Sequence, residues 1–508
     1  MNFSEFKIGT LLRFEDEGAG CFVYEYSNVR EREYFASLSE LSKQGYTKKE
    51  EYEIWVNSFS AFEKDGELVL CSYYPKSHKA IIVSEPNSAY FGLADTVGTK
   101  LVTPLFTQID LEDFGESVVV RLSDGRFIVY DGGREFEPDA DKLVKCLCEQ
   151  SPHEVPVVAA WIMTHPHCDH YRCFVVAQRK YPDAFTVERF IYNFTDTEDK
   201  DIERIPTLIK DREWLCDFEK AVAETGASVY RAHTGQVYNI GGACLEVLSS
   251  PDNTLIPPVK DVNALSLVIK MTIDGQAIMM CADSNLNMTT LAEDFGGHLK
   301  SDILQPTHHM FVGGDIETYN LIDPKVCVVP SFEADVFARI SPYQNKCKKE
   351  NLHLFYGMNV EEFYTGSTGN VVLPLPYTPK QNGRREYIEK LASYRKALGA
   401  ESWYFMDMTA EDCEFTFLNT TAEAANVSAD LYFEDIANIL LSIKFTVPSM
   451  RTKRINILNT EEVDGNALYY NNHSLAKKGV AEGVPFTVSF KSDIPIVIKG
   501  KKPADYHS

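Results

Sequence analysis

The chain has 508 residues, more than one hydrophobic core usually organises, so we expect two or three folded units. Hydrophobic residues make up 44% of the sequence and charged residues 24%, which excludes a disordered or fibrous protein. The net charge of −24 argues against a polyanionic partner, because nucleic acid is held by neutralising its phosphates with Lys and Arg. We therefore expect no nucleic-acid binding.

The beginning of the chain lacks the basic start and apolar stretch of a secretory signal. The longest apolar runs, such as 155–163, are far shorter than the roughly 20 residues of a membrane-spanning helix. Twelve cysteines are spread from Cys21 to Cys413 without a dense framework, as is typical of reduced thiols. We expect a soluble cytoplasmic protein without membrane contact.

Residues 1–100 are expected to form a small α/β unit. An apolar run at 21–26 is followed by apolar residues at helical spacing between 34 and 45. Short segments rich in aromatic and β-branched residues then predict strands at 58–62, 67–74 and 79–83. No pattern in this unit indicates a catalytic site.

Residues 101–376 alternate between strand and helix patterns, which indicates a layered α/β domain. A hairpin is predicted from 117–122 and 127–130, closing in Asp131-Gly132-Gly133, with a helix at 139–150. The apolar run 157–163 predicts a strand buried on both faces that leads directly into Thr164-His165. Further strands are predicted at 229–232, 244–248, 265–271, 277–281, 326–329 and 371–375.

Residues 377–508 are expected to form an accessory domain. A helix is predicted at 384–398 and ends at Gly399. Short strands are then predicted at 415–418, 440–447, 454–458, 485–490 and 495–498. This pattern favours a β-rich domain of the sandwich type.

Three histidines and an aspartate lie within six residues, directly after the predicted buried strand. They are His165, His167, Asp169 and His170. Neutral imidazoles suit zinc and other first-row metals, and a carboxylate compensates charge, so one loop can serve two neighbouring ions. The cluster therefore predicts a dinuclear metal site.

The loop resembles the signature of the metallo-β-lactamase superfamily. Asp131-Gly132-Gly133, Ala282-Asp283 and Thr307-His308-His309 resemble the corresponding segments of its DNA-uptake competence branch, which also includes phosphorylcholine esterases. The resemblance covers residues 101–376. It implies an α/β (α+β) fold, the αβ/βα four-layer sandwich of that superfamily, flanked here by the small amino-terminal unit and the β-rich accessory domain.

The resemblance also implies a set of ligands. His165 and His167 would bind one ion, Asp169 and His170 the other, and Asp283 would bridge both. Of the pair after residue 307, we expect His308 to complete the second ion's ligands. His309 would then either contact the substrate's developing negative charge or support a metal ligand through a hydrogen bond. Asp131 is expected to support a histidine of the loop through a hydrogen bond.

The sequence departs from the superfamily pattern in two places. Many members supply a further ligand of the first ion from a Gly-His-Thr turn, where this chain has Ser249-Ser250-Pro251-Asp252-Asn253. Asp252, Asn263 and His233 are the candidates for that role. Glycine follows the histidine pair in the competence-type branch, whereas Met310 follows it here.

The expected function is metal-dependent hydrolysis of a phosphodiester or related ester of a small substrate. Two divalent ions about 3.5–4 Å apart can share a hydroxide that attacks the ester. We expect zinc, with manganese or iron as alternatives, and catalytic roles for Asp169, Asp283 and His309. Two other hypotheses are a di-iron protein of redox or persulfide chemistry and a non-catalytic binding module with a remnant metal site. The terminal regions are candidates for forming a homodimer.

Overall fold

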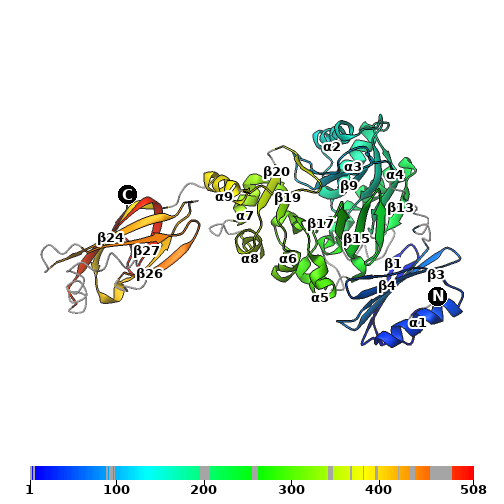
Figure 1. Cartoon of the computed structure of the whole chain (residues 1–508), viewed down its shortest axis with the longest axis horizontal. Helices are drawn as coiled ribbons and strands as arrows, with labels where there is room; N and C mark the ends of the chain where they lie inside the picture. Colours follow the sequence, from blue (N-terminus) through cyan, green and yellow to red (C-terminus); the bar gives the residue numbers. More distant parts are fainter. Residues whose placement is uncertain are drawn as a thin grey trace. The chain divides into compact units, whose positions relative to one another are not determined.

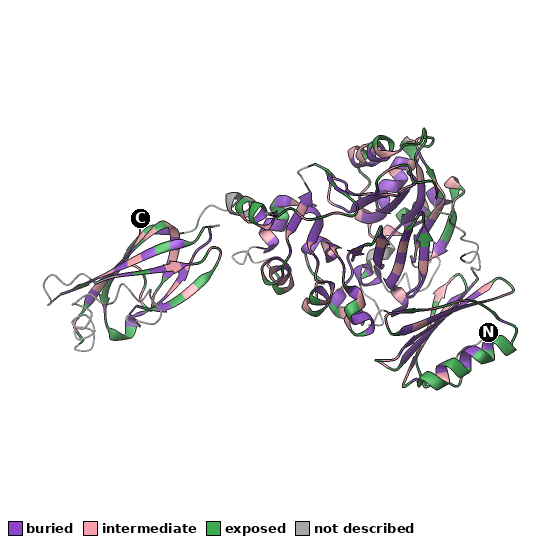
Figure 2. Cartoon of the chain, viewed as in Figure 1, coloured by how far each residue is buried: buried purple, intermediate pink, exposed green. Residues whose placement is uncertain are grey.

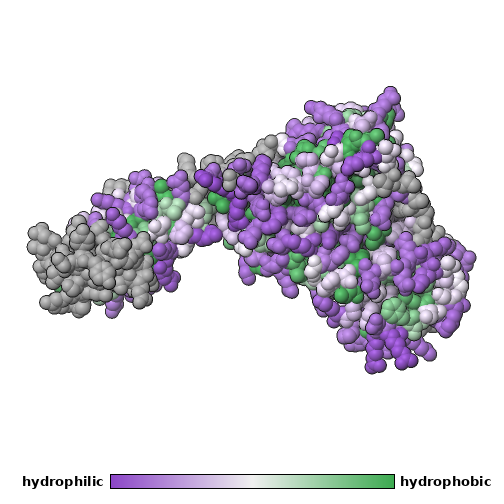
Figure 3. All heavy atoms as spheres, viewed as in Figure 1, coloured by the Kyte–Doolittle hydropathy of each residue, from purple (hydrophilic) through white to green (hydrophobic). Residues whose placement is uncertain are grey.

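The computed structural model describes residues 3, 6–86, 90, 95, 98–194, 206–253, 261–340, 347–366, 369–381, 383–394, 399–421, 423–434, 441–457 and 483–507 (Figure 1). Its contacts divide the chain into two compact units, Met1–Gly383 and Arg384–Ser508. No helix among the described residues is long and apolar enough to cross a membrane. Figure 3 shows hydrophilic residues over most of the visible face, with hydrophobic ones scattered among them.

The first unit begins with an antiparallel sheet of six strands in the order β1-β2-β6-β5-β4-β3. The strands are β1 (Thr10–Gly18), β2 (Cys21–Ser27), β3 (Thr47–Ile54), β4 (Asn57–Lys64), β5 (Glu67–Tyr74) and β6 (Lys79–Glu85). Helix α1 (Glu31–Lys43) buries Tyr34, Leu38 and Leu41 and leaves its outer face exposed (Figure 2). The expected strands are present. The edge strands β1 and β3 were not expected, because they are charged and largely exposed.

Two further sheets face each other in the rest of the first unit. One has the order β13-β12-β10-β9-β8-β7-β21, with β11 beside β10, and the other the order β14-β15-β16-β17-β18-β19-β20. Gln108 of the first sheet donates a hydrogen bond to the backbone oxygen of Val329 in the second. The hydroxyl of Tyr130 in the first sheet donates to the backbone oxygen of Leu267, directly before a strand of the second.

The strands of the first of these sheets are β7 (Leu105–Gln108), β8 (Ser117–Arg121), β9 (Phe127–Asp131), β10 (Val157–Ile162), β11 (Thr186–Val187), β12 (Arg189–Tyr192), β13 (Ser228–Arg231) and β21 (Val371–Pro374). Those of the second are β14 (Val237–Ile240), β15 (Ala243–Ser249), β16 (Val268–Ile273), β17 (Gln276–Met280), β18 (Ile303–Gln305), β19 (Val326–Phe332) and β20 (Glu362–Gly366). The strand expected at 265–271 begins only at Val268, because 262–265 form a short helix, η5.

Helices cover the outer faces of both sheets (Figure 1). Those on the first sheet are α2 (Glu137–Gln150), α3 (Cys168–Lys180) and α4 (Pro206–Thr225), and those beside the second are α5 (Leu291–Phe295), α6 (Ile316–Ile322), α7 (Glu333–Ile340) and α8 (Lys349–Leu352). Trp161 of β10, Phe174 of α3 and Phe218 of α4 belong to one buried cluster. The expected four-layer αβ/βα architecture is confirmed.

The second unit is β-rich, as expected. After α9 (Gly383–Tyr394) come β22 (Ala400–Met408), β23 (Glu414–Leu418), β24 (Ala425–Phe433), β25 (Leu441–Val447), β26 (Thr452–Asn456), β27 (Phe486–Lys499) and β28 (Tyr506–His507). The two strands expected at 485–490 and 495–498 are one strand, β27, whose first part pairs with β22 and β24 and whose last part pairs with β23. Parts of three expected elements, residues 395–398, 440 and 458, lie outside the described residues.

Candidate metal centre

The histidine loop connects β10 to α3. His165 and His167 precede the helix, while Asp169 and His170 lie in its first turn. Because β10 is buried along its length, the loop begins inside the protein, and the side chains of His165 and His170 have no exposed surface. Nε2 of His165 lies 3.1 Å from Nδ1 of His167.

Asp283 is the residue on which the other side chains converge. It follows β17, and its Oδ2 lies 3.4 Å from Nε2 of His170, 3.9 Å from Nε2 of His165 and 3.6 Å from Nε2 of His308. Its Oδ1 lies 3.4 Å from Nε2 of His309. The structure therefore brings the expected bridging aspartate against three of the expected histidines and His309.

His309 lies deeper in the centre than His308. Its side chain is fully buried, its Nδ1 donates a hydrogen bond of 2.6 Å to the backbone oxygen of Pro330, and its Nε2 lies 3.7 Å from Oδ2 of Asp169. The side chain of His308 is 20% exposed. Asp169, His170 and His309 form one group of close ligand atoms, and His165, His170 and Asp283 form another.

Asp131 lies behind the centre, at the end of β9. Its Oδ2 accepts hydrogen bonds from Nδ1 of His170 at 2.7 Å and from the hydroxyl of Thr164 at 2.8 Å. Its Oδ1 accepts from the backbone N–H of Thr164, also at 2.8 Å. A carboxylate only accepts, so Nδ1 of His170 carries the proton and Nε2 is free to face Asp283.

The backbone of the centre is strained. Positive φ angles, which side-chain-bearing residues rarely adopt, occur at Asp131 (55°), Ala282 (46°), His308 (50°), His309 (49°) and Met310 (61°). Buried Arg339 compensates part of this cost by donating to the backbone oxygen of His309, and Asn351 donates to that of Met310. Met310 thus adopts the conformation that the glycine of the competence-type branch would favour.

The charges of the centre favour a cation. Burial opposes charging of His170, but the carboxylates of Asp283, Asp131 and Asp169 outweigh it and raise the pKa of His170 well above 6.5. Burial would raise the pKa of Asp283, yet the surrounding histidines hold it well below 3.8. The centre therefore attracts positive charge even when its carboxylates are buried.

The ligand atoms themselves fit metal ions. Among the described residues, Nε2 of His170, Nε2 of His309 and Oδ1 of Asp283 are buried and make no hydrogen bond. Buried polar atoms are normally satisfied, so such a group indicates a bound species that supplies the missing interactions. Ligands about 2.0–2.2 Å from one tetrahedral ion are about 3.3–3.6 Å apart, close to the 3.4 Å separations around Asp283.

Two of the candidates for the further ligand of the first ion lie elsewhere. Nδ1 of His233 is 2.9 Å from Oδ1 of Asp252, and Nε2 of His233 faces Glu85 at 3.4 Å. The structure thus pairs these residues with each other and with the amino-terminal sheet. Asn263 lies in η5, where its side-chain amide is 3.4 Å from Oδ2 of Asp261 and its Oδ1 makes no hydrogen bond to a described residue.

Sequence reasoning did not identify Glu116, which lies behind the loop. It is fully buried, and its carboxyl oxygens make no hydrogen bond to a described residue. Burial, together with the charge of Asp131, raises the pKa of Glu116 well above 4.5. The neighbouring Gly115 is a local sign that this segment packs closely against the loop. A Cβ atom at Gly115 would lie 2.7 Å from the backbone oxygen of Asp169.

A small cleft of about 10 Å³, with room for about one water molecule, lies beside residues that contact His309. Its lining includes Leu111, Phe114, Pro330 and Phe332, together with the polar residues Gln108 and Ser331. The ring of Phe114 lies 4.3 Å from that of His309, and Pro330 is the residue that accepts the hydrogen bond of His309. The cleft therefore places both polar and apolar side chains beside the centre.

No protein-family model matches the chain, and no curated protein matches it. Solved structures of the metallo-β-lactamase fold do match it. The metallo-β-lactamase fold protein YhfI from Bacillus subtilis is 12% identical and covers 53% of this chain and 99% of its own, with a TM-score of 0.32.

Two other similar structures have nearly the same extent. Zn²⁺-bound PqqB from Methylobacterium extorquens is 12% identical and covers 52% of this chain and 88% of its own, with a TM-score of 0.33. Unliganded yeast PDE1 is 11% identical and covers 54% of this chain and 100% of its own, with a TM-score of 0.33.

Proposed function

We propose that the protein is a metal-dependent hydrolase that holds two divalent ions in this centre and cleaves a phosphodiester or related ester of a small substrate. The observation that carries the proposal is the convergence of buried imidazole nitrogens and carboxylate oxygens that have no hydrogen-bond partner among the described residues. Such a donor set suits zinc, and manganese or iron can also occupy it.

The ligand assignment differs from the sequence-based one in a single respect. We assign His165 and His167 to the first ion, Asp169 and His170 to the second, and Asp283 to both. His309 completes the second ion in place of His308, because its Nε2 faces Asp169 and Asp283 and its Nδ1 is held by Pro330. Partly exposed His308 then faces the substrate.

When bound, the ions would polarise the ester and lower the pKa of a water nucleophile. The residues of the chain supply the rest. Asp169 is 14% exposed and Asp283 is 2% exposed, so Asp169 is the carboxylate better placed to receive the proton of the attacking water and pass it to solvent. Asp131 and Pro330 fix the orientations of His170 and His309 before the substrate arrives.

The surroundings of the centre favour a small anionic ester. The side chain of Arg134 is 43% exposed at the rim, 3.8 Å from Asp113, and its charge also acts on Asp169. A guanidinium at this position suits a phosphate oxygen.

The proposal is tested by elemental analysis of the full chain purified without chelators, together with hydrolysis of bis-para-nitrophenyl phosphate. We expect Asp283→Ala to lose two ions per chain relative to the unmodified protein and at least about 100-fold of its activity. Exposed Asp323→Ala is the control and should lose neither. Equal metal content in Asp283→Ala and the unmodified protein would overturn the proposal.

A second pair of variants tests the exchanged roles of the two neighbouring histidines. We expect His309→Ala to lose one ion, and His308→Ala to keep both ions while its kcat/KM falls. The reverse result would restore the sequence-based assignment. Iron as the bound metal, with visible absorbance and no phosphodiester hydrolysis, would instead support redox chemistry.

A further inference from the structure

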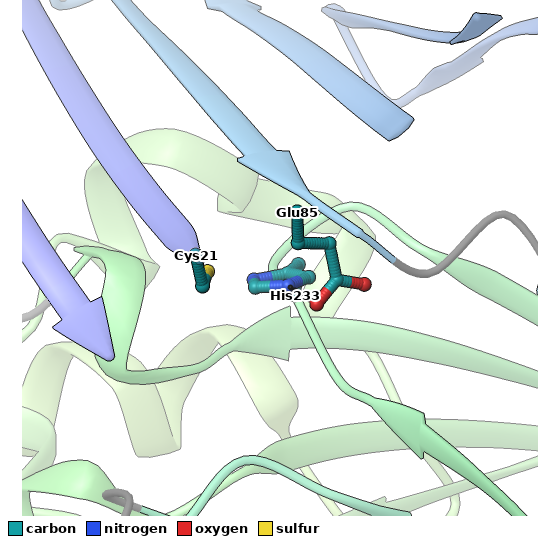
Figure 4. Close-up of side chains that lie close together, drawn as sticks. All are labelled: Cys21, Glu85 and His233. Carbon is teal, nitrogen blue, oxygen red and sulfur yellow. Dashed lines mark ion pairs between the residues drawn. The ribbon is translucent and has the colours of Figure 1, made fainter. Parts of the chain in front are cut away.

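A second group of ligand-type side chains lies at the junction of the amino-terminal sheet and the rest of the first unit (Figure 4). Cys21 is the first residue of β2, Glu85 is the last of β6, and β2 and β6 are neighbours in the sheet. Glu17 lies near the end of β1, which pairs with β2. His233 comes from the other side, between β13 and β14. We call these four residues the junction cluster.

Two separations between ligand atoms of the junction cluster are those expected around a tetrahedral ion. Nε2 of His233 lies 3.4 Å from Oε2 of Glu85, and Sγ of Cys21 lies 3.6 Å from Oε2 of Glu17. The ligand atoms of Cys21, Glu85 and His233 all lie within 4.8 Å of one another. Ligands at about 2.0–2.3 Å from one zinc ion are about 3.3–3.8 Å apart.

The imidazole of His233 is already oriented as a ligand. Its Nδ1 lies 2.9 Å from Oδ1 of Asp252, and the other oxygen of that carboxylate accepts from the hydroxyl of Ser250 and the backbone N–H of Thr234. A carboxylate that holds one ring nitrogen fixes the tautomer and leaves the other nitrogen for a metal. Here that nitrogen points toward Glu85 and Cys21 (Figure 4).

Burial makes the unsatisfied oxygen of the cluster significant. Cys21, Glu85 and His233 are 1%, 4% and 0% exposed. Oε1 of Glu85 makes no hydrogen bond within the described part of the chain, and Nε2 of His233 faces Oε2 of Glu85 at 3.4 Å and the thiol of Cys21. Buried polar atoms without partners are rare, and a bound ion is one of the few species that satisfies them.

The cluster also carries excess negative charge. Its surroundings contain the three carboxylates of Glu17, Glu85 and Asp252. The guanidinium of Arg231 hydrogen-bonds to Cys21, and its single positive charge also acts on Glu17 and Glu85. The nearby guanidinium of Arg13 is already paired with Glu15 and Glu25. A divalent cation would offset the remaining charge, and its binding would release the thiol proton of Cys21 to solvent.

A glycine in the turn between β13 and β14 allows the amino-terminal sheet to pack closely against that turn. Gly235 has φ of +94°, and a Cβ atom there would lie 2.1 Å from the ring of Phe59 in β4. The hydroxyl of Tyr52 in β3 donates to the backbone oxygen of Gly235 at 2.6 Å. Only glycine allows the amino-terminal sheet to approach the turn this closely, and His233 is two residues away.

We propose that Cys21, His233, Glu85 and Glu17 form a structural zinc site that joins the amino-terminal sheet to the turn between β13 and β14. Four protein ligands, three of them deeply buried, leave no position for a substrate, as in structural zinc sites. The thiolate distinguishes this site from the histidine centre, whose ligands are all nitrogen and oxygen. A borderline-soft ion such as Zn²⁺ suits the mixed donor set.

The thiolate gives the test its readout. Co²⁺ bound to a thiolate has a sulfur-to-metal charge-transfer band in the near ultraviolet, which Co²⁺ bound only by nitrogen and oxygen lacks. We expect the cobalt-loaded full chain to show this band and Cys21→Ser to lose both the band and one metal ion per chain. Cys71→Ser, at another buried cysteine of the same sheet, should keep the band and the ion.

The same measurement separates this proposal from the hydrolase proposal. Asp283→Ala should keep the band whatever happens to hydrolysis, since Asp283 is not in the junction cluster. If Cys21→Ser does not fold, Glu85→Gln is the second variant, and we expect it to bind Zn²⁺ at least about 10-fold more weakly at the site that gives the band.

Two results would overturn the zinc site. One is a cobalt-loaded chain without the band, which would make the cluster a metal-free ion-pair network centred on a protonated His233. The other is a band that persists in Cys21→Ser and disappears in Cys168→Ser, which would place the thiolate in the histidine loop.

Discussion

Asp131 acts on the metal centre only through hydrogen bonds. One oxygen holds Nδ1 of His170 and the hydroxyl of Thr164, and the other holds the Thr164 backbone. The residue has a positive φ of 55°, which places its carboxylate behind the loop at a conformational cost. In the proposed function, Asp131 would therefore position the ligand His170 without being a ligand itself.

We predict that Asp131→Asn weakens metal binding by about 10–100-fold while the fold is kept. The amide has the shape of the carboxylate, but it lacks the charge that orients and strengthens His170 as a ligand. Competition with a chromophoric chelator measures the affinity. Asp274→Asn is the matched control, because Asp274 also has a positive φ, of 47°, and lies in the turn between β16 and β17. Unchanged affinity in Asp131→Asn would show that His170 needs no such support.

Helix α3 is held in place by ion pairs with α4. Asp217 of α4 accepts from Nη1 of Arg172 at 3.0 Å and from Nη1 of Arg179 at 3.1 Å, and its side chain is 29% exposed. Because α3 carries Asp169 and His170 in its first turn, these pairs also fix the position of the metal centre. The hydrogen bond from Arg179, opposed by burial and aided by Arg172, lowers the pKa of Asp217 below 3.8.

The lowered pKa of Asp217 predicts a pH dependence. A carboxyl group whose pKa is lower in the folded state stabilises the protein above its unfolded pKa, and this contribution is lost as pH falls through the folded pKa. We predict that Asp217→Asn lowers the free energy of unfolding by about 0.5–1 kcal/mol at pH 7. Denaturant titrations should show the difference shrinking below pH 3.8. In an Arg172→Ala/Arg179→Ala background the substitution should have little effect at any pH.

The local patterns of the sequence predicted the elements that carry the site. A continuous apolar run at 157–163 identified β10, and the histidines after it had to lie at the end of that strand. The sequence could not predict which of His308 and His309 lies deeper in the centre. Positive φ angles at both residues decide which imidazole turns inward. The pairing of His233 with Asp252 and Glu85 was not predictable for a different reason, since Glu85 is far away in sequence.

In the accessory unit, too, the sequence did not predict a feature that depends on contacts between distant segments. Alternating apolar residues predicted its strands. However, the sequence predicted two strands in place of β27, because Lys491, Ser492 and Asp493 interrupt the apolar pattern. Pairing with β24 ends at Ser492 in that segment, while β22 still pairs at Ile496 and pairing with β23 begins at Val497. Such a change of partner is a property of the assembled sheets and leaves only a polar break in the sequence.

In the first unit as a whole, β6 is connected to the rest of the unit at both ends. Glu85 at its carboxyl end belongs to the junction cluster. At its amino end, Nζ of Lys79 lies 2.8 Å from Oδ2 of Asp294 in α5, with side-chain exposures of 10% and 0%. Lys79 also donates to the hydroxyl of Thr290, and Asn57 donates to the backbone oxygen of Asp294. The amino-terminal sheet is therefore expected to unfold together with the layers that hold the metal centre.

We predict that Lys79→Met destabilises the first unit by about 3–5 kcal/mol, because it leaves the carboxylate of Asp294 buried without its partner. Lys76→Met is the control, since exposed Lys76 makes only a cation–π contact with Trp55, worth about 0.5–1 kcal/mol. Urea denaturation followed by tryptophan fluorescence in a Trp403→Phe background reports on this unit, because Trp403 lies in the second.

Lys79→Met combined with Asp294→Leu should recover much of the lost stability, since replacing both charges by apolar groups removes the uncompensated carboxylate. Metal content measured along the same titration distinguishes two cases. If the amino-terminal sheet and the four layers unfold as one cooperative body, fluorescence and metal release will share one midpoint in Lys79→Met. An early fluorescence change with the metal retained would mean that the sheet detaches by itself and that the buried pair does not couple it to the centre.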